Sequence, residues 1–183
     1  MTISNEKVRD RGVYAETSDA SATEFKSRCV EPQPMVSKSG LCRMNWQELN
    51  VRAIRGHQAM SGTVRFRIND LSESGDLCRV EVTIDGVDAA GAGTDLFGAL
   101  AQARQALEKN GITLVVNGAR RDVFPSAMLR QTSQGRTAYV HTMPRSTMRP
   151  VAVDIFEAAT SDAELATVDE QRAWHEHWAQ SQG

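Results

Sequence analysis

The residues with the greatest chemical potential in this sequence are four arginines in the segment 114–139. They are Arg120, Arg121, Arg130 and Arg136. A guanidinium group presents its N–H donors as a planar fork, which matches the oxygens of a carboxylate or a phosphate. The four side chains could therefore bind an acidic protein surface, a small anion or a nucleic acid. They could also be solvated and balanced by acidic residues of the same chain.

A second group that could take part in chemistry is the hydroxyl of Ser126, which follows Phe-Pro. Serine is a favoured helix N-cap and proline fixes the approach of the chain, so we expect Ser126 to cap a short helix that runs to Gln131. No Gly-x-Ser-x-Gly pattern surrounds this serine, and we assign no catalytic residue. The alternative is a pocket around Asn117, Arg120 and Ser126 that binds a small ligand or supports an enzymatic reaction.

Metal and cofactor signatures are weak throughout the chain. His175 and His177 are two positions apart, so on a helix they point in opposing directions and cannot share a metal ion. Gly91-Ala92-Gly93 lacks the spacing of a dinucleotide-binding or phosphate-binding loop. We expect Ala89–Gly93 to be a small-residue loop that leads into a helix. The sequence therefore predicts no metal site and no cofactor.

The charge distribution is uneven, although the net charge is only −2. Residues 117–150 contain six arginines and one aspartate, whereas residues 151–183 contain seven carboxylates and one arginine. The small net charge argues against a molecule whose whole surface binds nucleic acid or an anionic membrane. The segregation predicts either two opposite surfaces that screen each other within the fold or a charged face that binds a partner.

Cysteine usage and hydropathy bear on the compartment. The three cysteines, Cys29, Cys42 and Cys78, form no CxxC pair and are too few for a disulfide framework. Neither a signal-peptide core nor an apolar run of roughly 18–20 residues is apparent. We therefore expect a cytoplasmic protein that makes no contact with a membrane.

The first predicted elements are strands with alternating apolar and polar residues, joined as an antiparallel meander. They span residues 49–55, 64–68 and 78–84. A helix is expected over 96–107, with Thr94 as N-cap, an apolar stripe that packs on the sheet and a stop at Asn110-Gly111. The apolar run 112–116 predicts a central strand that is covered on both faces.

Two further strands and a helical tail are expected beyond this region. The strands span 137–142 and 151–156, and the tail is helical in composition from 162 to 180. Trp174 and Trp178 are four positions apart, so they lie on one side of the tail helix and are expected to hold it against the body of the protein.

These elements predict the fold class and the domain organisation. The class is α+β, with a mainly antiparallel sheet packed against one central amphipathic helix and a C-terminal helix. The expected parts are a flexible N-terminal arm (1–40), an α+β domain (41–160) and a C-terminal helix docked on that domain (161–183).

Several motifs between residues 78 and 180 together resemble a widespread group of small, uncharacterised bacterial proteins. The motifs are Asn117-Gly118-Ala119-Arg120, Asp122 to Met128, Gly135-Arg136-x-Ala138-Tyr139, Val153 to Phe156 and Ala166 to Trp174. The pattern Asn-Gly-x-Arg…Pro-Ser-x-Met is the most distinctive. The resemblance implies a cytoplasmic immunity protein that binds a secreted antibacterial toxin, and it supplies no catalytic residue. Residues 1–60 fall outside it.

The expected function is therefore that of a non-enzymatic protein that neutralises a cognate toxin domain by direct occlusion. The expected partner-binding residues are Asn117, Arg120, Arg121, Arg136, Arg145 and Arg149. The acidic face of the tail is an alternative interface. A nucleic-acid-binding module is a further interpretation, and its affinity would fall steeply with salt.

Overall fold

The computed structural model describes residues 46–68, 77–143 and 149–181. The chain divides into two units, residues 1–40 and residues 41–183, and every described residue belongs to the second unit. The expected N-terminal arm, 1–40, and the cysteines Cys29 and Cys42 therefore lie outside the described residues.

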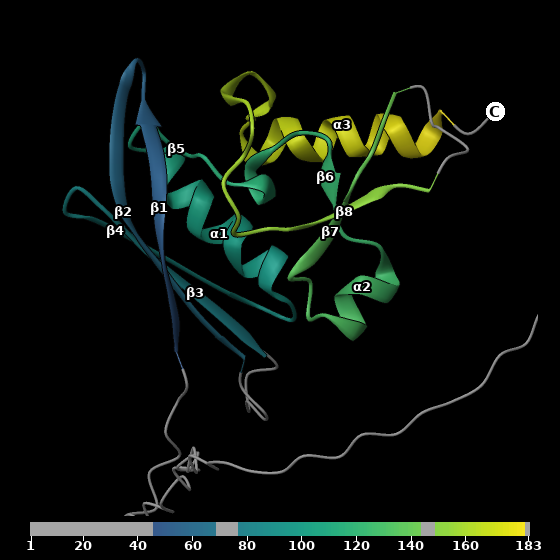
Figure 1. Ribbon diagram of the computed structural model, residues 1–183, viewed down its shortest axis with the longest axis horizontal. Coiled ribbons are helices and arrows are strands. Elements are labelled where there is room, and N and C mark those ends of the chain that lie inside the picture. Colours follow the sequence, from purple (N-terminus) through teal and green to yellow (C-terminus); the bar gives the residue numbers. More distant parts are fainter. Residues whose placement is uncertain (1–45, 69–76, 144–148, 182–183) are drawn as a thin grey trace, which may run out of the picture. The chain divides into compact units, whose positions relative to one another are not determined.

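Five antiparallel strands form the larger sheet, in the order β4-β3-β2-β1-β5 (Figure 1). The strands are β1 (Gln47–Arg55), β2 (Gln58–Ile68), β3 (Cys78–Ile84), β4 (Val87–Gly93) and β5 (Ile112–Leu114). Apolar residues alternate with polar ones along β3, so that Val80, Val82 and Ile84 are buried on one face. The predicted meander of the first three strands is confirmed.

Strand β4 corrects the expectation of a loop at Ala89–Gly93. Asp85 and Gly86 have φ angles of 48° and 76°, which is the geometry of a two-residue hairpin turn, and the chain therefore returns alongside β3. Alanine and glycine have low strand propensity, which is why the sequence did not indicate a strand here. Their small size is needed, because a Cβ atom on Gly91 would lie 2.0 Å from the carbonyl oxygen of Ala99.

Helix α1 (Leu96–Glu108) packs on β4 and β3 and is the central helix that the sequence predicted. Its N-cap is Asp95 rather than Thr94, and the Asp95 carboxylate accepts a hydrogen bond of 2.8 Å from the backbone N–H of Gly98. In Figure 1, α1 lies between the larger sheet and the part of the chain that forms β6–β8 and α3. Its apolar stripe supplies much of the core.

Strand β5 corrects the prediction of a central strand at 112–116. It has only three residues, and it pairs with the end of β1 at the edge of the sheet. The run Ile112–Val116 is nevertheless buried throughout except for half-buried Thr113, because the chain that follows β8 lies beside it. Burial alone therefore accounts for its apolar composition.

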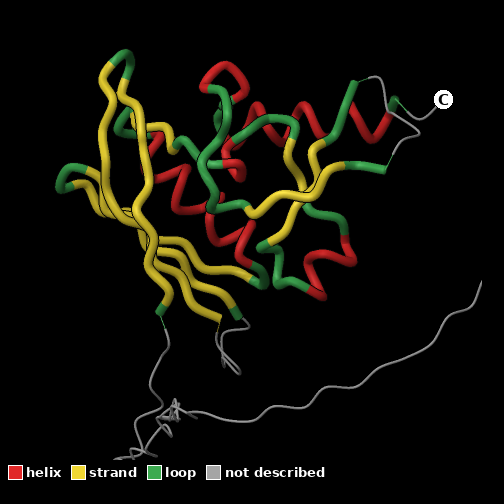
Figure 2. The backbone as a smooth tube through the Cα atoms, in the orientation of Figure 1, coloured by secondary structure: helices red, strands yellow, loops and turns green. Residues whose placement is uncertain are grey.

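A smaller sheet follows, in the order β6-β7-β8, and Figure 2 shows its strands apart from those of the larger sheet. Its strands are β6 (Val123–Phe124), β7 (Thr137–Val140) and β8 (Val151–Asp154). Three short helices accompany them: η1 (Asn117–Ala119) before β6, α2 (Ala127–Thr132) between β6 and β7, and η2 (Asp162–Glu164) after β8. Ser126 caps α2 as predicted, since its hydroxyl oxygen accepts a hydrogen bond of 3.2 Å from the N–H of Leu129. Residues 144–148, including Arg145, lie outside the described residues.

Helix α3 (Val168–Gln180) ends the described chain. It begins with a capping box, in which Thr167 accepts from the N–H of Glu170 and the Glu170 carboxylate accepts from the N–H of Thr167. The predicted α+β class, with an antiparallel sheet, a central helix and a C-terminal helix, is confirmed. No helix in the described part of the chain has both the length and the apolar character that crossing a bilayer requires.

We expect Gly91→Ala to lower the free energy of unfolding by about 1–3 kcal/mol, because the added methyl group must push α1 away from β4. Urea denaturation measures the change. Ala90→Ser, on the exposed side of the same strand, is the matched control and should stay within about 0.5 kcal/mol of wild type. Equal stability of Gly91→Ala and wild type would contradict the close contact.

Candidate functional site

The segment 114–139, which carries most of the predicted site, is bound by Arg104. This arginine lies in the middle of α1 and is only 2% exposed. Its Nη1 donates to the carbonyl oxygen of Gly118 at 2.8 Å and to Oε1 of Gln171 at 2.6 Å. Its Nη2 donates to the carbonyl oxygen of Ala166 at 2.6 Å and lies 3.5 Å from Glu108 Oε1. Burial lowers the pKa of Arg104 to about 10, and the charge of Glu108 acts in the opposite direction.

Gln171 on α3 completes this buried cluster, and it is also 2% exposed. Its amide nitrogen donates to the carbonyl oxygens of Gly118, Arg120 and Val123, at 3.2, 2.6 and 3.0 Å. Glu108 accepts a hydrogen bond of 3.1 Å from the N–H of Val168. The positive end of the α3 dipole also stabilises a carboxylate at this position. Arg104, Glu108 and Gln171 thus join α1, the segment 118–123 and α3, and we call them the buried polar cluster.

The structure places two of the expected partner-binding residues inside the protein. Arg120 is 9% exposed, and its guanidinium binds both oxygens of Asp122, at 3.0 and 2.8 Å. It also forms an ion pair of 3.0 Å with Glu164. The hydrogen bond to Asp122 raises the pKa of Arg120, burial opposes this, and the charges of Asp122 and Glu164 add to the rise. Asn117 is 6% exposed, and its amide donates to the carbonyl oxygen of Asp154 at 3.2 Å.

The remaining predicted arginines have different surroundings. Arg136 forms an ion pair of 2.7 Å with Asp154, and its guanidinium lies over the ring of Phe66. Arg121 and Arg149 are exposed, and no ion pair joins either to another described residue. The predicted residues therefore do not converge on one point, and Asn117, Arg120 and Ser126 line neither of two hollows on the described part of the protein.

One of these hollows is an apolar cavity of about 190 Å³ between α1, β6 and α3. Its lining residues are Phe97, Gly98, Ala101, Phe124, Arg130, Val168, Gln171 and Arg172. The Arg130 guanidinium lies 5.4 and 5.5 Å from the ring centres of Phe97 and Phe124, where a cation is attracted by the ring faces. Arg130 also forms an ion pair with Asp95, the N-cap of α1. The guanidinium of Arg130 thus lies beside a mainly apolar space that Arg172 also lines.

A row of rings continues from this cavity along α3. Phe124 stacks on His175 with ring centres 3.7 Å apart, and His141 lies 4.1 Å from Trp178. Trp178 thus packs on the chain after β7, in keeping with the expected role of the tryptophans, and Trp174 is half-buried. Burial is the largest factor that lowers the pKa of His175, followed by the charges of His141 and Arg130.

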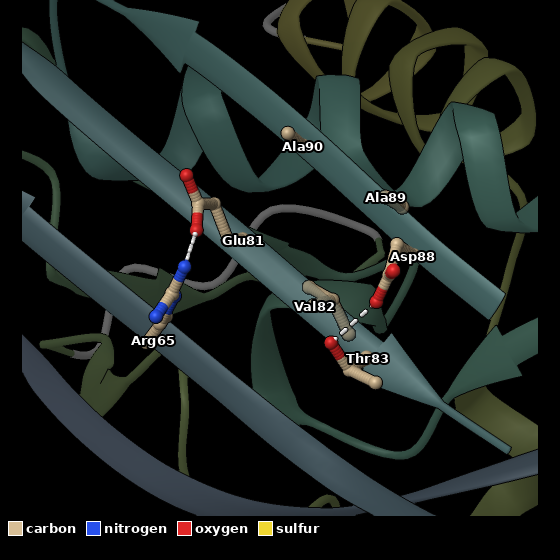
Figure 3. A pocket seen from close by; sticks show the side chains of 7 residues that line it. All are labelled: Arg65, Glu81, Val82, Thr83, Asp88, Ala89 and Ala90. Carbon is tan, nitrogen blue, oxygen red and sulfur yellow. Dashed lines mark hydrogen bonds and ion pairs between the residues drawn. The ribbon is translucent and has the colours of Figure 1, made fainter. Parts of the chain in front are cut away.

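The second hollow, of about 320 Å³, lies on the face of the larger sheet opposite α1 (Figure 3). Figure 3 shows Arg65, Glu81, Thr83 and Asp88 on neighbouring strands. These side chains are bonded to one another, since Arg65 donates to Glu81 at 2.7 Å and Thr83 donates to Asp88 at 2.6 Å. The hollow is therefore a polar surface whose side chains already bond to one another.

Sequence reasoning missed Arg104 and Gln171, although a signal was present. Arg104 stands four positions after Leu100 and three before Leu107, so it occupies the apolar stripe of its helix. Gln171 stands three positions after Val168, on the side of α3 that carries Trp178 seven positions later. A polar residue at an apolar position of a helix predicts a buried hydrogen-bond cluster. The sequence could not indicate that the two residues meet.

Comparisons with known proteins add no assignment. No protein-family model matches this chain, and no curated protein matches it significantly. Within the described ranges, no group of three or more His, Cys, Asp or Glu side chains is arranged to hold a metal ion.

We expect Gln171→Leu to lower the free energy of unfolding by roughly 3 kcal/mol, since each buried polar group left without a partner costs about 1–3 kcal/mol. The change removes an acceptor from Arg104 and the donor to three carbonyl oxygens. Gln180→Leu, at an exposed position of the same helix, is the control and should change stability by less than about 0.5 kcal/mol. Urea denaturation compares the two, and equal effects would contradict the role of the buried polar cluster.

We expect stability to fall at acid pH because of His175. Its pKa is lowered in the folded protein, so the unfolded chain binds the proton more readily and the free energy of unfolding decreases below about pH 6.5. His175→Phe keeps a ring on Phe124 and removes the titration. It should therefore lose less stability than wild type between about pH 7.5 and about pH 5.5.

The control for this prediction is His177→Phe, on the exposed side of the same helix. We expect it to keep the pH dependence of the wild-type protein in the same denaturation experiment. If His175→Phe and wild type lose equal stability on acidification, His175 is not the group that carries the effect.

Proposed function

We propose that this protein binds another protein and that it neutralises a toxin domain by occluding it. The observation that carries the proposal is the division of the basic segment 117–150 into internal and external charges. Arg120, Arg130 and Arg136 form ion pairs within the fold, whereas Arg121 and Arg149 extend their charge to solvent. The exposed charges fit an acidic surface on a partner, and the resemblance to small bacterial proteins favours a toxin as that partner.

The internal contacts of Glu164 also make the backbone beneath this exposed surface rigid. Glu164 binds the guanidinium of Arg120, and the N–H of Arg121 donates to the carbonyl oxygen of Glu164 at 3.0 Å. Glu164 therefore fixes the backbone at Arg120 and Arg121, while the Arg121 side chain remains exposed. A charge on a fixed backbone loses less conformational entropy on binding, and it also steers the encounter with an oppositely charged partner.

The experiment is affinity capture from a lysate of the native cells, followed by mass spectrometry. We expect the tagged wild-type protein to recover one dominant, stoichiometric partner. The variant Arg121→Glu/Arg149→Glu should associate with the purified partner about tenfold more slowly at low salt, because steering by complementary charge is lost. Co-expression supplies the functional readout, since the wild-type protein should prevent the growth arrest that the partner causes.

The matched control is Arg55→Glu/Lys109→Glu, which makes the same change in net charge at two exposed positions elsewhere in the fold. We expect it to keep the association rate and the protection of the wild-type protein. Recovery of no specific partner, or of a partner that does not impair growth, would overturn the proposed function.

A further inference from the structure

The apolar cavity has a size that fits one aromatic ring. Its volume is about 190 Å³, and an apolar cavity of ~150 Å³ is sufficient to bind benzene. Phe97, Ala101, Phe124 and Val168 give it an apolar lining, and Gly98 leaves its wall without a side chain. Phe97 and Phe124 line the cavity, and aromatic rings favour a further aromatic ring in an edge-to-face or offset arrangement.

Two arginines stand at the rim of the cavity, and each is paired with an aspartate. Arg130 is held over Phe97 and Phe124, and its side chain is 32% exposed. A guanidinium has five N–H donors, so the bond from Nη1 to Asp95 leaves it able to bind a further carboxylate. Arg172 is 61% exposed and lies 3.7 Å from Asp169, an exposed pair that contributes little energy. Asp95, the partner of Arg130, is buried at 5% exposure.

We propose that this cavity receives one aromatic side chain of a partner protein and that carboxylates beside that side chain bind Arg130 and Arg172. The inference deepens the proposed function and rests on it, because the occupant belongs to the protein that is bound. Binding energy in protein interfaces is concentrated where an aromatic anchor fills a pocket, surrounded by polar contacts at the rim. The two guanidinium groups favour a partner that has acidic residues next to the anchor.

The lining also favours an aromatic side chain over a nucleotide, although a nucleotide likewise combines a ring with negative charge. A nucleobase carries polar atoms along its edge, and the cavity lining offers almost only carbon atoms to them. The Gln171 amide, the uncharged polar side-chain group of the lining, already donates to three carbonyl oxygens and accepts from Arg104. Burying a base edge without hydrogen bonds is unfavourable, so a phenyl ring fits better than a base.

The wall that α3 contributes is present before any partner binds. Val168 and Gln171 stand at the start of α3, and the buried polar cluster holds both through Glu108 and Arg104. A preformed pocket loses less entropy when it is filled than one that must be ordered first. This cavity is therefore suited to an anchor residue.

The first test titrates the wild-type protein with three short peptides and measures the chemical shifts of the backbone amides by NMR. The probes are acetyl-Asp-Phe-Glu-amide, acetyl-Asp-Ala-Glu-amide and acetyl-Lys-Phe-Lys-amide. We expect the first peptide to shift the amides of Gly98, Ala101 and Val168, and the other two to bind at least about tenfold more weakly. Equal binding of the three peptides, shifts elsewhere on the protein, or tighter binding of adenosine monophosphate would overturn the proposal.

The second test fills the cavity with Ala101→Leu and uses Ala173→Leu, on the exposed side of α3, as the control. We expect Ala101→Leu to lose the peptide shifts and to bind the captured partner at least about tenfold more weakly, with the control unchanged. A partner that binds both variants equally would overturn the anchor and leave the proposed function intact. Peptide binding at the cavity with no toxin recovered from the lysate would overturn only the proposed function.

Discussion

The described fold depends on the buried guanidinium of Arg104. A charge this far from water is tolerated only when its donors are paired, and its acceptors come from Gly118, Ala166 and Gln171. Those residues lie on segments that are separated along the sequence, so pairing the charge requires all of them to be in place together. Glu108 supplies the counter-charge and also receives the N–H of Val168, which fixes the start of α3. The C-terminal helix is therefore part of the core hydrogen bonding and not an appendage to it.

This arrangement explains how the segregated charges of the sequence are used. The acidic chain after β8 returns along residues 115–121, and the isolated bridges Val116–Ala158 and Arg120–Leu165 bring Glu164 to Arg120. Part of the opposite charge is thereby neutralised inside the fold, as one of the two interpretations of the sequence held. The exposed remainder is the charge of Arg121 and Arg149, and Arg130 at the apolar cavity keeps N–H donors beyond its bond to Asp95. Some arginines of the segment 117–150 thus form ion pairs within the fold, and others are exposed for the proposed binding.

Sequence patterns predicted those parts of the fold in which each residue's environment depends on its near neighbours. Alternation along β1 to β3, the apolar stripe of α1 and the Ser126 cap are local signals, and each was correct. Strand β4 was missed because it consists of Ala and Gly next to β3, where packing against α1 outweighs strand propensity. The surroundings of Asn117 and Arg120 depend on partners more than 30 residues away, such as Asp154 and Glu164, and no periodicity reveals such pairing. The apolar cavity likewise combines residues of α1, β6, α2 and α3.

Because the buried polar cluster joins α3 to α1, we expect α3 to open together with the core. Native-state hydrogen exchange measures this directly, because it gives an opening free energy for each protected amide. We predict that the amides in the middle of α3, such as Trp174 and His175, open with nearly the same free energy as those in the middle of α1. Exchange of the α3 amides through a much lower-energy opening, while α1 stays protected, would contradict the claim. It would also mean that the wall of the apolar cavity is not fixed before a partner binds.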